Sequence, residues 1–217
     1  MKSDGGELLK WIKFGDFNDK RLMHRLAKRN FEHNSAVGIS AKDCVTVINS
    51  KKLLRAQKLG SFPMMKLSKA KLSDTCCEVI ATYNALKLCG KISDDESFTF
   101  FFKLCSEFVV NALLLLPSGH FGSNPFKIKN CLSAYSQPFT KVSRLSEFEE
   151  KMKDGDVAIV SFRHHFFCIH TFCAVKQGEK LISINRGGSC DYEWKNDTLS
   201  QCLRKNRFLV GYILKNT

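Results

Sequence analysis

Residues 75–88 read TCCEVIATYNALKL, and this stretch sets the fold of the chain around it. From Cys77 onward, apolar and small side chains recur at helical spacing, and Gly90 follows as a stop signal. Thr75 and Glu78 fit the capping-box pattern, so we expect Thr75 to cap the helix and Glu78 to reach back to its backbone. Cys77 then lies in the first helical turn, where free N–H groups and the helix dipole lower the pKa of a thiol.

The rest of the chain divides into a helical part followed by strands. Helices are expected at 17–31, 97–116, 126–135 and 145–152, and strands at 44–48, 156–162, 166–175, 181–185 and 207–214. Gln177 and Gly178 indicate a hairpin turn between two of the strands, and His164 and His165 are expected at a turn. Helices first and antiparallel strands second predict an α+β fold.

The 97–116 segment is long enough to cross a membrane, but its polar residues argue against that. Lys103, Glu107 and Asn111 follow one another at steps of four, which places them on one face of a helix. We therefore expect an amphipathic helix of a globular domain and no transmembrane segment.

A histidine and an asparagine downstream complete a catalytic pattern with Cys77. On an extended strand, His170 shares a face with Cys168 and Phe172, and Asn185 ends the next strand across the hairpin. A thiol nucleophile needs a base, and the base needs an orienting group. Each residue also has an ordinary structural explanation, as a small residue at a helix start, a satisfied core histidine or the opening of a turn.

Together these segments resemble the bacterial double-glycine leader peptidases, which are papain-like domains. The likeness covers roughly residues 62–214. It lies in CEVIATYNAL at 77–86, HTFCAV at 170–175, the Ile184-Asn185 pair and GHFGSNP at 119–125. It implies a papain-like cysteine peptidase fold, with Cys77 as nucleophile on the helical half, and His170 as base and Asn185 as orienting residue on an antiparallel sheet. The glycine-rich loop, with Gly119, Gly122 and Asn124, is the implied substrate-binding segment.

The chain departs from that family at three positions. Glu78 and Val79 follow the cysteine where Gly-Pro is usual, and Asn185 replaces the usual Asp. Lys71 stands six residues before Cys77, where the family carries the glutamine of the oxyanion hole. Ser73 or backbone N–H groups near Cys77 are then the expected oxyanion donors.

Length, charge and composition indicate the domain organisation, the compartment and the kinds of partner to expect. The chain has 217 residues, a net charge of +13, ten Cys and eighteen Phe. Residues 1–60 are expected to form a basic N-terminal extension or subdomain, and 61–217 the peptidase domain. Met1 to Lys20 contains no long apolar run, so we expect a cytoplasmic protein with reduced thiols. Nucleic-acid binding is not expected, because no nucleic-acid motif accompanies the charge.

The predicted function is a cysteine peptidase that cleaves a peptide or leader-peptide substrate through a thioester acyl-enzyme. The partner is a peptide or protein substrate, and no cofactor or metal is expected. Cys168, His170 and Cys173 fall close together, but their spacing does not suit a zinc site. A catalytically inactive peptide-binding module of the same fold is the main alternative, and nucleic-acid or membrane binding through the basic surface is a third.

Overall fold

The computed structural model describes residues 19–40, 44–93, 98–111, 113–116, 118–165, 168–187, 194–196 and 198–215. Its helices are α2 (Lys20–Val37), α4 (Leu72–Thr75), α5 (Cys77–Leu88), α6 (Thr99–Val110), α7 (Ile128–Ala134), α8 (Leu145–Lys151) and α9 (Leu199–Leu203), with short 3-10 helices η2 (Phe62–Met64) and η3 (Pro125–Lys127). The strands are β1 (Val45–Ile48), β2 (Lys51–Leu54), β3 (Lys66–Leu67), β4 (Ala70–Lys71), β5 (Phe139–Val142), β6 (Val157–His165), β7 (Cys168–Gln177), β8 (Lys180–Ile184), β9 (Trp194–Asn196) and β10 (Arg207–Leu214).

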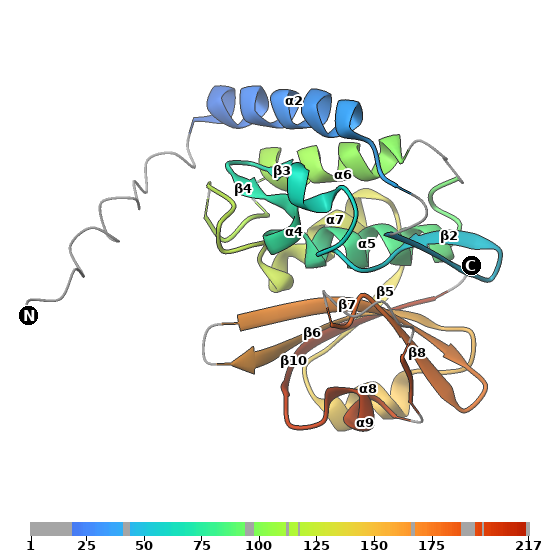
Figure 1. Cartoon of the computed structure of the whole chain (residues 1–217). Coiled ribbons are helices and arrows are strands. Elements are labelled where there is room, and N and C mark those ends of the chain that lie inside the picture. The colour runs from blue at the N-terminus through green and yellow to red at the C-terminus, as the bar shows by residue number, and fades with distance from the viewer. Residues whose placement is uncertain are drawn as a thin grey trace, which may run out of the picture.

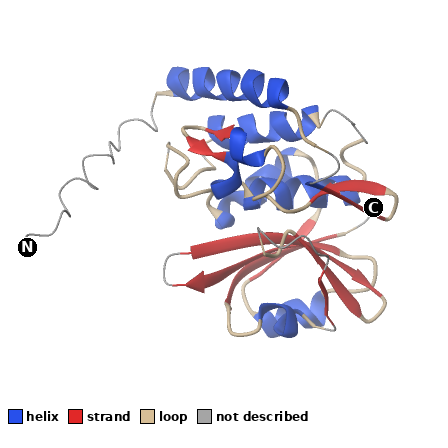
Figure 2. Cartoon of the chain, viewed as in Figure 1, coloured by secondary structure: helices blue, strands red, loops and turns tan. Residues whose placement is uncertain are grey.

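One six-stranded sheet organises the C-terminal half of the molecule (Figure 1). Its strand order is β5-β10-β6-β7-β8-β9, and every neighbouring pair is antiparallel. The last strand in the sequence, β10, lies between β5 and β6. The fold is therefore a mixed α+β arrangement of helices and antiparallel strands, as the sequence predicts (Figure 2).

Helices cover both faces of this sheet (Figure 1). Side chains alternate along each strand, so neighbouring residues belong to different cores. On β7, Cys173 and Val175 pack into the large core with α5 and α6, whereas Phe172 and Ala174 pack into a smaller core with α8 and α9. The residues of β7 that face α5 are thus the odd-numbered ones in this stretch.

The N-terminal segment contributes to the large core. Helix α2 packs on α6, and Met23 and Ala27 are buried one turn apart. Further along the same face, the Asn34 side chain bonds both backbone groups of Lys66, at 2.9 Å each. Residues of α2 and β2 share one continuous core with α5, and the division at residue 60 stays a prediction.

A buried asparagine fixes the β1-β2 hairpin to α5. Asn84 Oδ1 accepts from Leu54 N at 2.8 Å, and Asn84 Nδ2 donates to Leu54 O at 2.7 Å. The side chain thus replaces a neighbouring strand for one residue of β2. Asn84, a polar residue among the small and apolar side chains of α5, therefore serves to attach the β1-β2 hairpin to this helix.

Several elements agree with the sequence prediction. The α5 helix and the β10 strand have the predicted limits, and α6 is a helix shorter than 97–116. Residues 166 and 167 of the predicted 166–175 strand lie outside the described residues. The histidines at 164 and 165 end β6 rather than forming a turn, and His164 Nδ1 contacts Asn206 Oδ1 at 2.8 Å.

In the described part of the chain, no helix has both the length and the apolar character that a bilayer crossing needs.

Candidate functional site

Cys77 opens α5 and faces the sheet. The residue is 6% exposed, and the neighbouring α4 helix ends at Thr75, directly before the N-cap residue Cys76. The predicted capping box is wrong. Thr75 belongs to α4, where its hydroxyl donates to Lys71 O at 3.2 Å, and α5 has no side-chain cap.

The Glu78 side chain contacts the Cys77 thiol and does not form the predicted reciprocal cap with Thr75. Cys77 Sγ donates to Glu78 Oε2 at 3.1 Å, and Thr171 Oγ1 donates to Glu78 Oε1 at 3.1 Å. Burial and the adjacent Glu78 raise the pKa of Cys77 well above its ordinary value, although the Thr171 backbone N–H opposes this. The lowered pKa expected from the helix start is therefore wrong, because burial and the adjacent carboxylate raise the pKa of the thiol.

His170 is paired with the third predicted residue. Its Nε2 lies 2.6 Å from the backbone oxygen of Asn185. A carbonyl oxygen only accepts, so Nε2 carries the hydrogen and Nδ1 is the nitrogen that can take a proton. Burial lowers the pKa of His170 to about 4, and the nearby Arg186 contributes to the decrease. The imidazole is therefore neutral near pH 7.

The Asn185 side chain is held by a residue that the sequence did not single out. Gln57 N donates to Asn185 Oδ1 at 3.2 Å, and Asn185 Nδ2 donates to Gln57 Oε1 at 3.0 Å. Asn185 also has a φ of 61°, in the left-handed region that Asn tolerates better than most residues. The contact with His170 is thus made by the backbone oxygen of Asn185, while its amide joins the end of β8 to the segment after β2.

The thiol and the imidazole are not hydrogen-bonded to each other. Thr171 faces α5 and reaches Glu78, whereas the preceding His170 lies against the Phe162 ring, with ring centroids 5.7 Å apart. Phe162 belongs to the smaller core beneath α8 and α9. The structure therefore brings Cys77 beside the backbone next to His170 and leaves the His170 ring on the other side of β7.

The remaining predicted residues have structural partners. The Ser73 hydroxyl donates to Asp74 Oδ1 at 3.3 Å, and Ser73 O accepts from Gln57 Nε2 at 3.1 Å. Asn124 Oδ1 accepts from Phe126 N at 3.0 Å and caps η3. Gly119 and Gly122 have φ values of 79° and 70°, which glycine adopts without strain.

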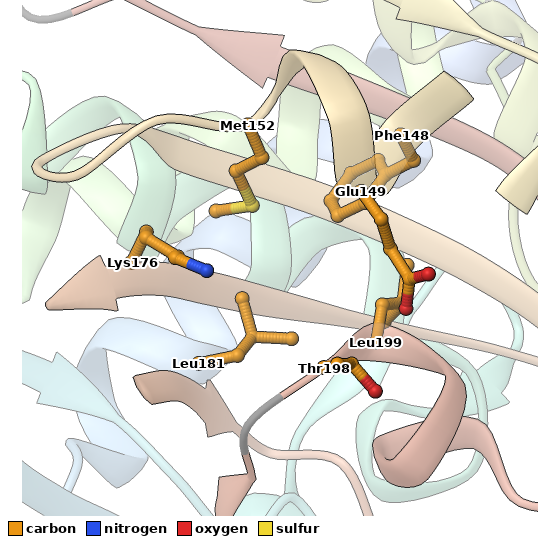
Figure 3. A pocket seen from close by; sticks show the side chains of 7 residues that line it. All are labelled: Phe148, Glu149, Met152, Lys176, Leu181, Thr198 and Leu199. Carbon is orange, nitrogen blue, oxygen red and sulfur yellow. The ribbon is translucent and has the colours of Figure 1, made fainter. Parts of the chain in front are cut away.

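An open hollow of about 410 Å³ lies apart from these residues, between α8, α9 and the sheet (Figure 3). Glu149 on its wall is already engaged, because it accepts from Ser200 N at 2.8 Å and from Ser200 Oγ at 2.9 Å. The hollow is lined by Phe148, Glu149, Met152, Lys176, Leu181, Thr198 and Leu199. None of the lining residues is a cysteine or histidine, so the hollow does not belong to the Cys77 site.

The described residues contain no cluster of side chains suited to bind a metal ion. No group of three or more His, Cys, Asp or Glu side chains among them is arranged to hold an ion. Cys168 is exposed on β7, whereas Cys173 is buried in the large core.

Comparisons with known proteins found only a weak structural similarity. No protein-family model and no curated protein matches it. Among solved structures, the Pseudomonas avirulence protein AvrPphB is similar over 64% of this chain and 90% of its own, with 11% identity and a TM-score of 0.34. A likeness this weak establishes no family, and the geometry of the site stands on its own.

Proposed function

We propose that this protein is a cysteine peptidase of papain-like fold that cleaves a peptide or leader-peptide substrate. Cys77 is the nucleophile, His170 the base, and Asn185 the residue that orients the base. The observation that carries the proposal is the pairing of His170 Nε2 with Asn185 O at 2.6 Å, one residue from the point where β7 meets Cys77. This pairing leaves the basic Nδ1 available on a neutral ring.

The reaction follows acyl-transfer chemistry. Cys77 Sγ attacks the carbonyl carbon, its proton passes to His170 Nδ1, and the C–N bond breaks as the amine leaves with that proton. Water then attacks the thioester and releases the acid and the free thiol. The reaction requires His170 Nδ1 to come within reach of Cys77 Sγ, a contact that the resting structure does not make. The backbone N–H groups at the start of α5 are the proposed oxyanion donors.

The first experiment exposes the full chain at pH 7.5 to a mixture of peptides from digested proteins and identifies new termini by mass spectrometry. Wild type and Cys168→Ala, a change of an exposed thiol on β7, should give the same new termini. Cys77→Ala should give none, and His170→Ala should cleave at least about 100-fold more slowly. An acid quench should also trap an acyl group on the Cys77 peptide.

A catalytically inactive peptide-binding module is the second candidate. The hydrogen bond from Cys77 to Glu78 favours it, because a buried thiol that donates to a carboxylate is a poor nucleophile. Absence of new termini with wild type, together with retention of peptides on the immobilised protein, would support this function and reject the peptidase. Cleavage that persists in folded Cys77→Ala would reject both.

A further inference from the structure

Glu78 is a buried carboxylate that forms no ion pair with any cation in the part of the chain that the structure describes. The residue is only 2% exposed. Removing a carboxylate from water is costly unless the charge is compensated. A neutral residue of similar shape would avoid that cost, so the carboxylate at this position calls for a role other than stability.

Hydrogen bonds converge on this carboxylate from the sheet and from the thiol. Thr171 has one hydroxyl hydrogen, which goes to Glu78 Oε1, so the Ser161 hydroxyl at 2.8 Å must be the donor to Thr171 Oγ1. The order of donation is thus Ser161 to Thr171 to Glu78. From the other side, Cys77 donates to Oε2. The thiol hydrogen is therefore directed at the carboxylate rather than at an imidazole.

The glycine-rich loop packs against the same group. A Cβ atom on Gly122 would lie 3.8 Å from Glu78 Oε2 and 3.6 Å from Thr75 O. Burial raises the pKa of Glu78, and hydrogen bonds from Cys77, Thr171 and the backbone of Ser123 oppose this increase. The loop segment expected to bind substrate therefore also shields the carboxylate from water.

We propose that Glu78 is a positioning residue that holds Cys77 in its protonated, unreactive form. Its carboxylate accepts the thiol hydrogen and repels the thiolate, so the resting protein is a latent form of the nucleophile. The term nucleophile rests on the proposed peptidase function, whereas the control of the thiol proton does not. Substrate that displaces the loop at Gly122 would hydrate Glu78 and release the restraint.

Other ionisable groups lie around this pair, and the test must separate their effects from that of Glu78. Burial, Cys105 and Glu78 all raise the pKa of the adjacent Cys76, which belongs to the large core. The ionisable groups on the elements around the pair include Cys76, Asp74 and its partner Lys58 on the α4 side, Cys105 on α6, His170 and Cys173 on β7, and His120 in the glycine-rich loop.

The test is the pH dependence of Cys77 alkylation by iodoacetamide in the native full-length chain, followed by peptide mapping. Glu78→Gln preserves the shape and removes the charge. It should shift the midpoint of the Cys77 profile downward by about one pH unit or more, which means about tenfold faster labelling at pH values below both midpoints. Glu107→Gln is the matched control. Glu107 lies on α6 and accepts a hydrogen bond from Tyr135 Oη at 2.7 Å, so its replacement should leave the midpoint of the Cys77 profile unchanged.

Glu78→Met provides a second variant with a similar length and no charge, in case the glutamine variant does not fold. A lower midpoint in either folded variant supports the proposal. A midpoint that is unchanged or higher in a folded variant, verified by circular dichroism, overturns it. Because the readout is alkylation and not cleavage, the result is independent of whether the protein hydrolyses peptides.

Discussion

At the residue scale, two glycines with the same φ angle allow backbone strain to be distinguished from a steric clash. Gly119 and Gly155 both have a φ of 79°, and nothing lies within 4 Å of a Cβ atom on Gly155. A Cβ atom on Gly119 would meet the carbonyl oxygen of Leu67. The glycine-rich loop is therefore built closely against the β3-β4 hairpin.

Gly119→Ala should lower the free energy of unfolding more than Gly155→Ala. Both changes carry the left-handed backbone penalty, about 1 kcal/mol, and only the first adds a clash worth about a further 1–3 kcal/mol. Urea unfolding of the two variants under the same conditions measures the difference. Equal losses would mean that the loop moves away without cost.

His170 should make the protein less stable in mild acid. Its folded pKa of about 4 lies below the 6.5 of the unfolded chain, so between these values the unfolded chain binds a proton that the folded chain does not. The contribution of His170 to stability is therefore present near pH 7 and is lost as the pH falls toward 4.

His170→Gln should reduce the fall in unfolding free energy between pH 7.0 and pH 4.5. Urea titrations at both pH values give the slope for wild type and variant, and His24→Gln on the exposed side of α2 is the control variant. If His170→Gln keeps the full wild-type slope, the imidazole does not titrate with a lowered pKa.

Glu78 and Thr75 show where sequence patterns mislead at this scale. The Thr-x-x-Glu pattern predicts a reciprocal cap, but the Thr75 hydroxyl is used by α4, and the Glu78 side chain turns toward β7. A short helix placed directly before α5, and a buried hydroxyl supplied from the sheet, decide both outcomes. Neither can be recognised from the local spacing of residues, since β7 lies nearly a hundred positions away.

At the element scale, periodic segments were predicted, as were the short strands β1 and β8, whereas several other short elements were not. α5 shows clear helical spacing and a following Gly90, and β10 is a continuous apolar run, so both limits were predictable. No sequence pattern predicted β5, β9 or α9, which have four, three and five residues. Segments of this length contain at most two periods of a strand or helix pattern, and their structure depends on neighbours in the sheet.

Asn84→Ala should destabilise the whole fold through the β1-β2 hairpin. The change leaves the N–H and C=O of Leu54 without their partners in a buried environment, and each such group costs about 1–3 kcal/mol. The midpoint of thermal unfolding, followed by circular dichroism, measures the loss. Asn111→Ala, at the exposed end of α6, should cost far less. Similar losses in the two variants would contradict the role of Asn84.

For the whole molecule, the net charge of +13 predicts that salt stabilises the fold. Charges of one sign repel each other in the compact state, and the repulsion is screened as ionic strength rises. The urea midpoint should therefore increase between about 0.02 and 0.3 M NaCl.

Replacing exposed cations should weaken this salt effect. Arg21→Gln with Arg25→Gln, on the exposed face of α2, removes two charges without touching the core. A flat or falling midpoint in the wild type would mean that surface ion pairs such as Lys28–Glu32 and Lys58–Asp74 outweigh the general repulsion.

The position of β10 has a consequence for how the protein is made. A ribosome delivers β5 and β6 long before Arg207–Leu214, yet these two strands meet only through β10. Until that last segment emerges, β5 and β6 each present an unpaired edge to which other nascent chains can add. The strand that carries His170 and Thr171, β7, pairs with β6 on the side away from β10, so the β6-β7 pair gains its neighbour on the β5 side only once β10 has emerged.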